Sequence, residues 1–366
     1  MKIAILRETT DGEKRVAATP DAVKKYIALG ASVCVANGAG VGSSIGDGEF
    51  EAAGAGISGD ISGADIILCV RPPAPAALAN AKDGAILLGM LEPYANRELL
   101  ATYNERKIAA FSLELLPRIS RAQSMDVLSS QSNLAGYRAV IDAVATFGKA
   151  VPMMMTAAGT VAPAKVLVLG AGVAGLQAIA TAKRLGAVVS AFDVRPVAKE
   201  QVESLGAKFI EVAAEENAET TGGYAKEMSD DYKRKQSELI AETIKKQDIV
   251  ISTALIPNRP APVLITEDMV ESMKQGSVIV DLAAASGGNC PLTELDKVVK
   301  KHGVTLIGYS NLPSRVAVDA SSLYARNLYN FVAGLLVDKD GINVKWEDEL
   351  VTGTLLTRNG EIVKNV

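Results

Sequence analysis

The chain has 366 residues, of which 48% are hydrophobic and 22% are charged, and its formal net charge is −4. This length suits two domains of ordinary size, and the acidic balance excludes the basic surface of a typical nucleic-acid-binding protein. No apolar run approaches the ~18 residues that span a membrane, and the start, MKIAILRET, lacks the apolar segment of a signal peptide. We therefore expect a cytoplasmic protein without direct membrane insertion.

Cysteine and histidine usage argues against several catalytic classes. The three cysteines, Cys34, Cys69 and Cys290, are dispersed in or beside apolar stretches, which is typical of reduced core thiols. The single histidine, His302, lies in a charged context before an apolar run and is interpreted as a surface residue. Zinc catalysis and Ser-His or Cys-His nucleophiles are therefore not expected, and we predict no metal site.

Strand-like and helix-like patterns alternate over the first 130 residues, which predicts a parallel sheet covered by helices on both faces. The expected strands are 2–6, 32–35, 65–70, 85–88 and 107–111, and the expected helices are 21–29, 47–53 and 96–103. No G-x-G-x-x-G occurs here, so we expect a flavodoxin-like domain that does not hold a nucleotide.

Two long apolar helices are expected at 129–144 and 316–336. Ser129, Ser130 or Ser132 is expected to cap the first of them. Because such helices can carry the chain between domains, we predict two Rossmann-like, doubly wound domains around a cleft that holds the cofactor. Their expected bounds are 1–130 plus 312–366, and 131–311. The triplet Met153–Met155 is interpreted as soft packing under the linker rather than as a functional surface.

The stretch from Lys165 to Arg195 carries the strongest motif. A buried-strand pattern at 165–169 leads into Gly170-Ala171-Gly172-Val173-Ala174-Gly175, a helix follows, and a second strand ends at Asp193. In this dinucleotide-binding pattern the three glycines permit a tight turn, close approach of a pyrophosphate and close helix packing. The helix N-terminus attracts the phosphates, and the acidic residue accepts hydrogen bonds from the ribose.

Asp193 favours NAD over NADP because a carboxylate repels a 2′-phosphate, although Arg195 could pair with such a phosphate. Glycines that serve only a tight turn are the alternative interpretation. The other strands of this domain are expected at 188–192, 208–210, 249–252, 278–281 and 305–307. The segment 221–224 is interpreted as a flexible loop, either a lid or an ordinary exposed turn, and Asn359-Gly360 predicts a β-hairpin.

Several further segments resemble one known family. RAQSMD at 121–126, SSQSNLAGYRAV at 129–140, MMMTAAGTV, GGYAKEMS and TALIPNRPAP are similar to the NAD(H)-binding component of proton-translocating nicotinamide nucleotide transhydrogenases. The resemblance covers nearly the whole chain and suggests the form in which this component is a separate subunit. It implies Si/Re-specific hydride transfer between NADH bound here and NADP⁺ bound on a partner, coupled to proton movement through a membrane component.

The resemblance also implies roles for individual residues. Arg118, Gln123, Asp126 and Ser129 match the family's catalytic loop, in which polar groups would orient the nicotinamide and its ribose. Besides the three glycines, the expected cofactor contacts are Arg121, Val173, Ala174, Asp193, Val194, Arg195, Gly223, Tyr224 and Leu255. The expected partners are an NADP(H)-binding component, a membrane-spanning component that attaches the chain peripherally to the inner membrane, and a second copy in a homodimer.

Two alternatives remain. The chain also resembles alanine dehydrogenases at Arg15-Val16-Ala17-Ala18-Thr19-Pro20, but that family uses a lysine, a histidine and an aspartate where this chain has Arg71, Glu92 and Ala285. Arg71 would not exchange its proton near neutral pH, and although Glu92 could act as a base, the set of catalytic residues is broken. We therefore interpret the retained Arg15 as structural or a remnant. The other alternative is an NAD-sensing binding module. Only one complete dinucleotide motif is present in the sequence, so the chain alone is expected to bind NADH yet to show little transhydrogenation.

Overall fold

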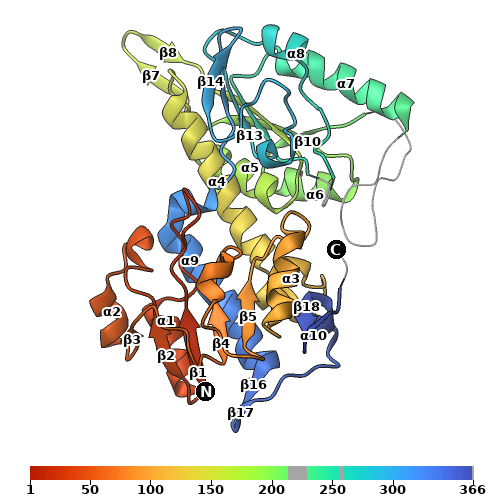
Figure 1. Cartoon of the computed structure of the whole chain (residues 1–366). Helices are drawn as coiled ribbons and strands as arrows, with labels where there is room; N and C mark the ends of the chain where they lie inside the picture. Colours follow the sequence, from red (N-terminus) through yellow and green to blue (C-terminus); the bar gives the residue numbers. More distant parts are fainter. Residues whose placement is uncertain (213–228, 256–258, 365–366) are drawn as a thin grey trace. The chain divides into compact units, whose positions relative to one another are not determined.

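A computed structural model describes residues 1–212, 229–255 and 259–364 (Figure 1). The chain divides into two compact units, and each is described by itself. The first unit comprises Met1–Gln131 and Pro313–Val366, and the second comprises Ser132–Leu312. Helix α4 (Val127–Thr146) begins in the first unit and continues in the second.

The first unit contains an eight-stranded sheet in the order β19-β18-β6-β5-β4-β1-β2-β3. Its parallel strands are β1 (Lys2–Ile5), β2 (Ser32–Val35), β3 (Gly56–Ile57), β4 (Ile66–Leu68), β5 (Ile86–Gly89) and β6 (Ala109–Ser112). Without the two-residue edge strand β3, the parallel order is 2-1-3-4-5, as in flavodoxin. The strands β18 (Leu355–Arg358) and β19 (Glu361–Ile362) extend the sheet in antiparallel fashion.

Side chains of this sheet alternate between two apolar layers, as the two-residue period of a strand requires. On β1, Ile3 and Ile5 join the cluster that includes α1 (Pro20–Ala28) and α9 (Ala317–Phe331), whereas Ala4 faces the cluster that includes α3 (Arg97–Glu105). Because both faces are covered, the strands are apolar throughout. The shorter helices α2 (Asp47–Ala52) and α10 (Glu349–Thr354) complete the unit.

The second unit contains a seven-stranded sheet in the order β11-β10-β9-β12-β13-β15-β14. Its strands are β9 (Lys165–Leu169), β10 (Val188–Phe192), β11 (Lys208–Ile210), β12 (Ile249–Ser252), β13 (Val278–Asp281), β14 (Val298–Lys301) and β15 (Val304–Ile307). The parallel order is the 3-2-1-4-5-6 of a Rossmann fold. One face packs against α4, α5 (Val173–Arg184) and α6 (Val197–Ser204), and the other against α7 (Asp230–Ile244) and α8 (Glu267–Glu271).

Most expected elements are confirmed within a few residues. Strands β10, β11, β12 and β13 have the predicted bounds, and α9 continues into a π-helical turn, Val332–Leu336. The C-terminal hairpin is also confirmed, because Asn359 and Gly360 have φ values of 54° and 80°, as a type I′ turn requires. The antiparallel strand β14 was not expected.

Two local predictions are wrong. Helix α4 starts two residues earlier than expected, and its cap is Asp126, whose carboxylate accepts a hydrogen bond of 2.9 Å from the Ser129 amide. The serines lie within the helix because the aspartate before it already accepts from the free amide of Ser129.

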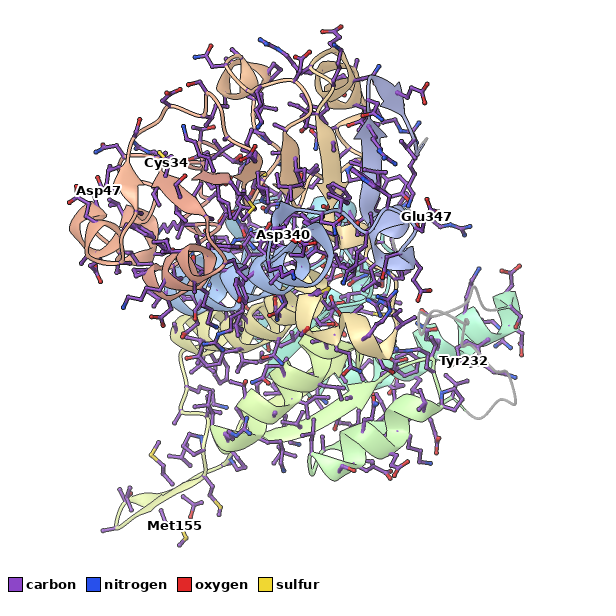
Figure 2. The ribbon with its side chains drawn as sticks, turned by 90° about the horizontal axis from the view of Figure 1, so that it is seen from below. Cys34, Asp47, Met155, Tyr232, Asp340 and Glu347 are labelled. Atoms are coloured by element: carbon purple, nitrogen blue, oxygen red, sulfur yellow. The ribbon has the colours of Figure 1, made fainter. Side chains whose placement is uncertain are left out.

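The methionine triplet does not pack under a linker. Met153, Met154 and Met155 are 60%, 43% and 79% exposed. Two of them belong to the hairpin of β7 (Met154–Thr156) and β8 (Gly159–Val161). Figure 2 shows Met155 on this hairpin, which projects away from the sheet of the second unit.

Candidate functional site

The candidate cofactor site lies at the carboxyl edge of the second unit's sheet. Strand order reverses around β9, so the segments that follow β9, β10 and β12 meet at one edge. Gly170, Asp193 and Thr253 are the first residues after these three strands. In open parallel sheets, this reversal point is where a ligand binds.

The glycine turn has the geometry of a dinucleotide-binding motif. Gly170 has a φ of +96°, which favours glycine, and a Cβ on Gly175 would lie 1.8 Å from the Gly170 carbonyl oxygen. The Thr253 hydroxyl donates to that same carbonyl over 3.0 Å and so ties the turn to the end of β12. Gly170 and Gly175 are therefore required by the fold, and Thr253 is a positioning residue that no sequence motif marks.

Gly172 is different because the fold does not require it. This residue caps α5 with a φ of −75°, and a Cβ there would meet nothing within 4 Å. The side chain that glycine lacks would project into open space at the N-terminus of the helix. In dinucleotide-binding motifs, a glycine at this position allows a pyrophosphate to approach the backbone closely. Val173, the next residue, lies on the same first turn and is 38% exposed.

Helix α4 packs directly against this first turn. A Cβ on Gly136 would lie 2.0 Å from the Ala174 carbonyl oxygen, so only glycine permits the contact. The backbone of the expected contact residue Ala174 is thus held in place by α4. Sequence reasoning missed Gly136 because its partner is 38 residues away (174 − 136) and no short motif links the two.

Asp193 is buried and fully engaged in hydrogen bonds. One carboxylate oxygen accepts from the Ala171 amide at 2.7 Å and from the Arg195 guanidinium at 2.8 Å, and the other accepts from the Arg195 amide and Nε at 2.8 and 2.9 Å. A carboxylate offers about four acceptor positions. The structure therefore brings Asp193, Arg195 and the glycine turn together. Val194, which lies between Asp193 and Arg195 in the sequence, packs against Tyr232 of α7.

The loop after β12 presents the expected contact Leu255, which is 49% exposed. The buried Asn289 holds this loop, because its amide nitrogen donates to the carbonyls of Ala254 and Pro262, each at 2.8 Å. Its amide oxygen accepts from the Ser252 hydroxyl at 2.6 Å. The predicted contacts Gly223 and Tyr224, with the expected loop 221–224, lie outside the described residues.

The candidate catalytic loop belongs to the first unit. Residues Ser120–Met125 form a 3₁₀ helix directly before the cap Asp126, and Arg118 and Gln123 are exposed. Asp126 also accepts a hydrogen bond from the Ser129 hydroxyl. The structure thus brings Asp126 and Ser129 together.

Arg121, from the same loop, pairs with Asp348 at 2.7 Å and with Glu349 at 3.1 Å at the start of α10. These two ion pairs hold the Arg121 guanidinium against the first turn of α10.

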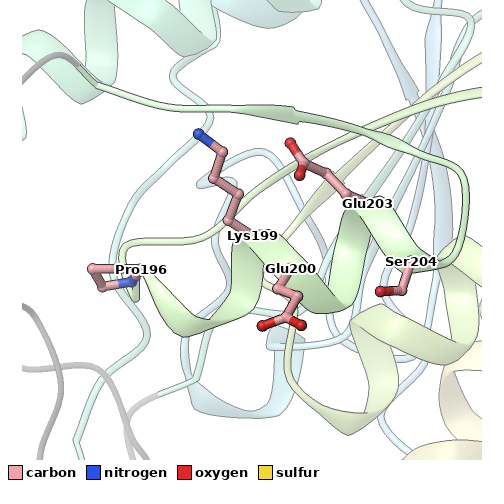
Figure 3. Close-up of a pocket in the computed structure, with 5 residues that line it drawn as sticks. All are labelled: Pro196, Lys199, Glu200, Glu203 and Ser204. Atoms are coloured by element: carbon pink, nitrogen blue, oxygen red, sulfur yellow. The ribbon is translucent and has the colours of Figure 1, made fainter.

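A hollow of about 530 Å³ lies along α6, a few residues after Arg195 (Figure 3). It is lined by Pro196, Lys199, Glu200, Glu203 and Ser204. Its one lysine is already paired with Glu211 at 2.8 Å. The excess of carboxylates makes it unsuited to a pyrophosphate.

The carboxyl edge of the first unit's sheet carries a partly buried ion-pair cluster. Arg15 is 2% exposed and donates to Glu13 at 2.6 and 2.8 Å and to the Gln131 amide oxygen at 2.9 Å. Arg71 donates to Glu13 at 3.1 Å and also pairs with Glu92. Both guanidinium groups are therefore neutralised by carboxylates of the chain itself.

Two further carboxyl groups lie at this edge. Burial raises the pKa of Glu8 to about 7, against the opposing effect of hydrogen bonds from the amides of Val70 and Arg71. Burial likewise raises the pKa of Glu114, which accepts from the Ser112 hydroxyl at 2.6 Å.

The described residues offer neither a metal cluster nor a membrane-spanning helix. Among residues 1–212, 229–255 and 259–364, no group of three or more His, Cys, Asp and Glu side chains could hold a metal ion. Within the same ranges, no helix has both the length and the apolar character needed to cross a bilayer.

Comparison with known proteins identifies the family of the chain. The family models for the N-terminal and C-terminal domains of alanine dehydrogenase/PNT match residues 4–135 and 139–365. The chain is 57% identical to the first part of NAD(P) transhydrogenase subunit alpha from Rhodospirillum rubrum, over 99% of this chain and 98% of that protein.

A solved transhydrogenase from Sinorhizobium meliloti superposes with a TM-score of 0.87 at 48% identity, covering 99% of each chain. The alanine dehydrogenase of Bacillus subtilis is 28% identical over 99% of this chain and 92% of that enzyme. The chain belongs to the alanine dehydrogenase/PNT family.

Proposed function

We propose that this chain is the NAD(H)-binding subunit of a proton-translocating transhydrogenase. In this proposal it donates hydride from NADH to NADP⁺ held on a partner subunit, and it attaches peripherally to the inner membrane, on the cytoplasmic side, through a membrane-spanning component. The glycine turn carries the proposal, because Gly172 is open at the start of α5 while Gly170 and Gly175 are fixed by packing. The 57% identity to a transhydrogenase subunit supports the reaction.

The residues at the turn fit NAD(H). The first amides of α5 would bind the pyrophosphate, aided by the helix dipole, and Asp193 would accept hydrogen bonds from the adenosine ribose. Since Arg195 and Ala171 now occupy all of its acceptor positions, Arg195 has to release one oxygen when the ribose binds. The remaining negative charge disfavours a 2′-phosphate and hence NADP(H).

When bound, NADH supplies the hydride, so the chain has only to orient the nicotinamide and exclude water. We propose that Arg118, Gln123, Asp126 and Ser129 orient the nicotinamide and its ribose. The mutual contacts of Asp126 and Ser129 hold two of these groups rigid before the nucleotide binds. No side chain needs to exchange a proton in such a transfer, so its rate depends mainly on the orientation of the nicotinamide. Polar groups that are held in position before binding favour that orientation.

The first unit's ion-pair cluster argues against alanine dehydrogenation. That reaction needs a group that exchanges a proton at the substrate carbon and a cation free to bind the substrate carboxylate. Arg15 and Arg71 are instead engaged with Glu13 and Glu92. The third aligned position, Ala285, has no titrating group.

A mixing assay tests the proposed function. The chain is combined with NADH, the NADP(H)-binding component of a related transhydrogenase and thio-NADP⁺, whose reduced form absorbs apart from NADH. Thio-NADP⁺ reduction that needs both proteins supports the proposal, whereas NADH binding without transfer indicates an NAD-sensing module. Gln123→Asn should slow transfer by roughly 100-fold while NADH affinity changes little. The exposed Gln201→Asn on α6 is the matched control and should change neither.

We also propose that the chain forms a homodimer and that the β7–β8 hairpin contributes to the interface. An isolated two-stranded hairpin is at best marginally stable. Met153, directly before this hairpin, is 60% exposed, and Met155 and Val161 within it are 79% and 39% exposed. Burial against a second copy would remove this apolar surface from water. Replacing Met153 and Met155 by Glu should give a folded monomer in sedimentation, and a dimer that persists would contradict the role of the hairpin.

A further inference from the structure

We infer that Asn327 is a positioning residue of the candidate catalytic loop, an inference that rests on the proposed function. Asn327 lies on α9 and is 7% exposed. Its amide nitrogen donates to the Ser124 carbonyl at 2.9 Å, and its amide oxygen accepts from the Ser130 hydroxyl at 2.7 Å. One buried side chain therefore joins the loop, the start of α4 and α9.

The two contacts bracket the residues that would orient the nicotinamide. Ser124 directly follows Gln123, and Ser130 directly follows Ser129. Asp126 lies between these anchors, and its own hydrogen bonds to Ser129 fix it to the same turn. Asn327 thereby limits movement at both ends of the segment through Ser124 and Ser130.

The chemistry of the partners selects an amide at this position. A backbone carbonyl only accepts hydrogen bonds, so the nitrogen of Asn327 has to face Ser124 and the oxygen has to face Ser130. Aspartate has the same shape but offers only acceptors when ionised, so it would place a buried negative charge against the Ser124 carbonyl. Leucine has a similar volume and satisfies neither contact, which leaves the Ser124 carbonyl with one donor fewer.

The same carbonyl provides an internal control. Asn330, one turn further along α9, also donates to the Ser124 carbonyl at 2.9 Å, but this contact is exposed to solvent. Water can replace an exposed donor, whereas it cannot easily reach the buried one. Asn330→Ala should therefore leave the loop in place.

The experiment measures single-turnover hydride transfer and NADH affinity in the full chain mixed with the NADP(H)-binding component. We expect Asn327→Asp and Asn327→Leu to slow transfer by roughly 10- to 100-fold with NADH affinity within about threefold of wild type, because displacement near 1 Å has effects of this size. Asn330→Ala should transfer hydride at the wild-type rate.

Transfer unchanged in both Asn327 variants, or lost in proportion to NADH affinity and to thermal stability, would overturn the inference. If the wild-type mixture transfers no hydride, the proposed function itself is wrong. The rate of hydride transfer in the wild-type mixture therefore distinguishes failure of the Asn327 inference from failure of the proposed function.

Discussion

The glycine turn permits a test in which stability and cofactor binding separate. Gly172→Ala adds a methyl group at the start of α5, where φ is −75° and no atom lies within 4 Å. Two small effects on stability oppose each other. Alanine stabilises the fold by about 0.4–1 kcal/mol because it reduces the conformational entropy of the unfolded chain. It destabilises the fold by a similar amount because it is a poorer N-cap than glycine. The free energy of unfolding should therefore stay within about 1 kcal/mol of wild type.

NADH affinity should respond quite differently. The methyl group added by Gly172→Ala would occupy the space through which a pyrophosphate approaches the first amides of α5. A hydrogen bond to a charged group contributes roughly 1.5–3 kcal/mol. Loss of one such contact weakens binding about 10- to 100-fold, which a titration of NADH fluorescence measures directly.

Gly175→Ala gives the opposite contrast within the same motif. Its Cβ would lie 1.8 Å from the Gly170 carbonyl oxygen, and real contacts are at least 3.0 Å, so the turn and the helix must separate by 1.2 Å (3.0 − 1.8). Overpacking of this kind destabilises by about 1–3 kcal/mol, so this variant should lose stability as well as affinity. Gly148→Ala, with open space around it, is the control and should change neither. Wild-type NADH affinity in Gly172→Ala would refute the placement of the pyrophosphate.

Three further variants test the charges. Because the pKa of Glu8 is raised from 4.5 to about 7, the native state holds this proton more strongly, and the stabilisation present below pH 4.5 is lost as pH rises to about 7. Glu8→Gln should remove this pH dependence. Relative to wild type, its free energy of unfolding in urea should rise by up to about 3 kcal/mol between pH 4.5 and about 7. Arg15→Met leaves the buried Glu13 with fewer partners and should lower the free energy of unfolding by about 3 kcal/mol. Asp193→Asn should weaken NADH binding about tenfold. It should also reduce the preference of the site for NADH over NADPH, which a competition experiment measures.

The sequence was most informative where local chemistry alone decides the structure. The strands β9, β10, β12 and β13 of the second unit are largely apolar runs, so their bounds could be predicted closely. The terminal hairpin was predictable for the same reason, because Asn359 and Gly360 both accept a positive φ. The alternation of strands and helices then indicated two doubly wound sheets.

Contacts between distant segments could not be predicted in this way. Thr253, Asn289 and Gly136 each hold part of the candidate cofactor site through partners that no spacing rule connects to them. The cap of α4 was predicted wrongly because serine and aspartate are both good helix caps, and three serines lie close to the one aspartate in the sequence. The strand β14 was missed because its four residues, Val-Val-Lys-Lys at 298–301, form neither a continuous apolar run nor an alternation of apolar and charged side chains.

The ion-pair cluster of the first unit explains how one fold can serve different chemistry. An amino-acid dehydrogenase has to move a proton as well as a hydride, so it needs a titrating group and a free cation beside its substrate. Transfer between two nicotinamides moves only the hydride, and nothing in that step requires Arg15 or Arg71 to remain free. Glu13 and Glu92 can therefore neutralise them. Arg15 then gains a different task, because its bond to Gln131 anchors the first turns of α4 immediately behind the loop that we propose orients the nicotinamide.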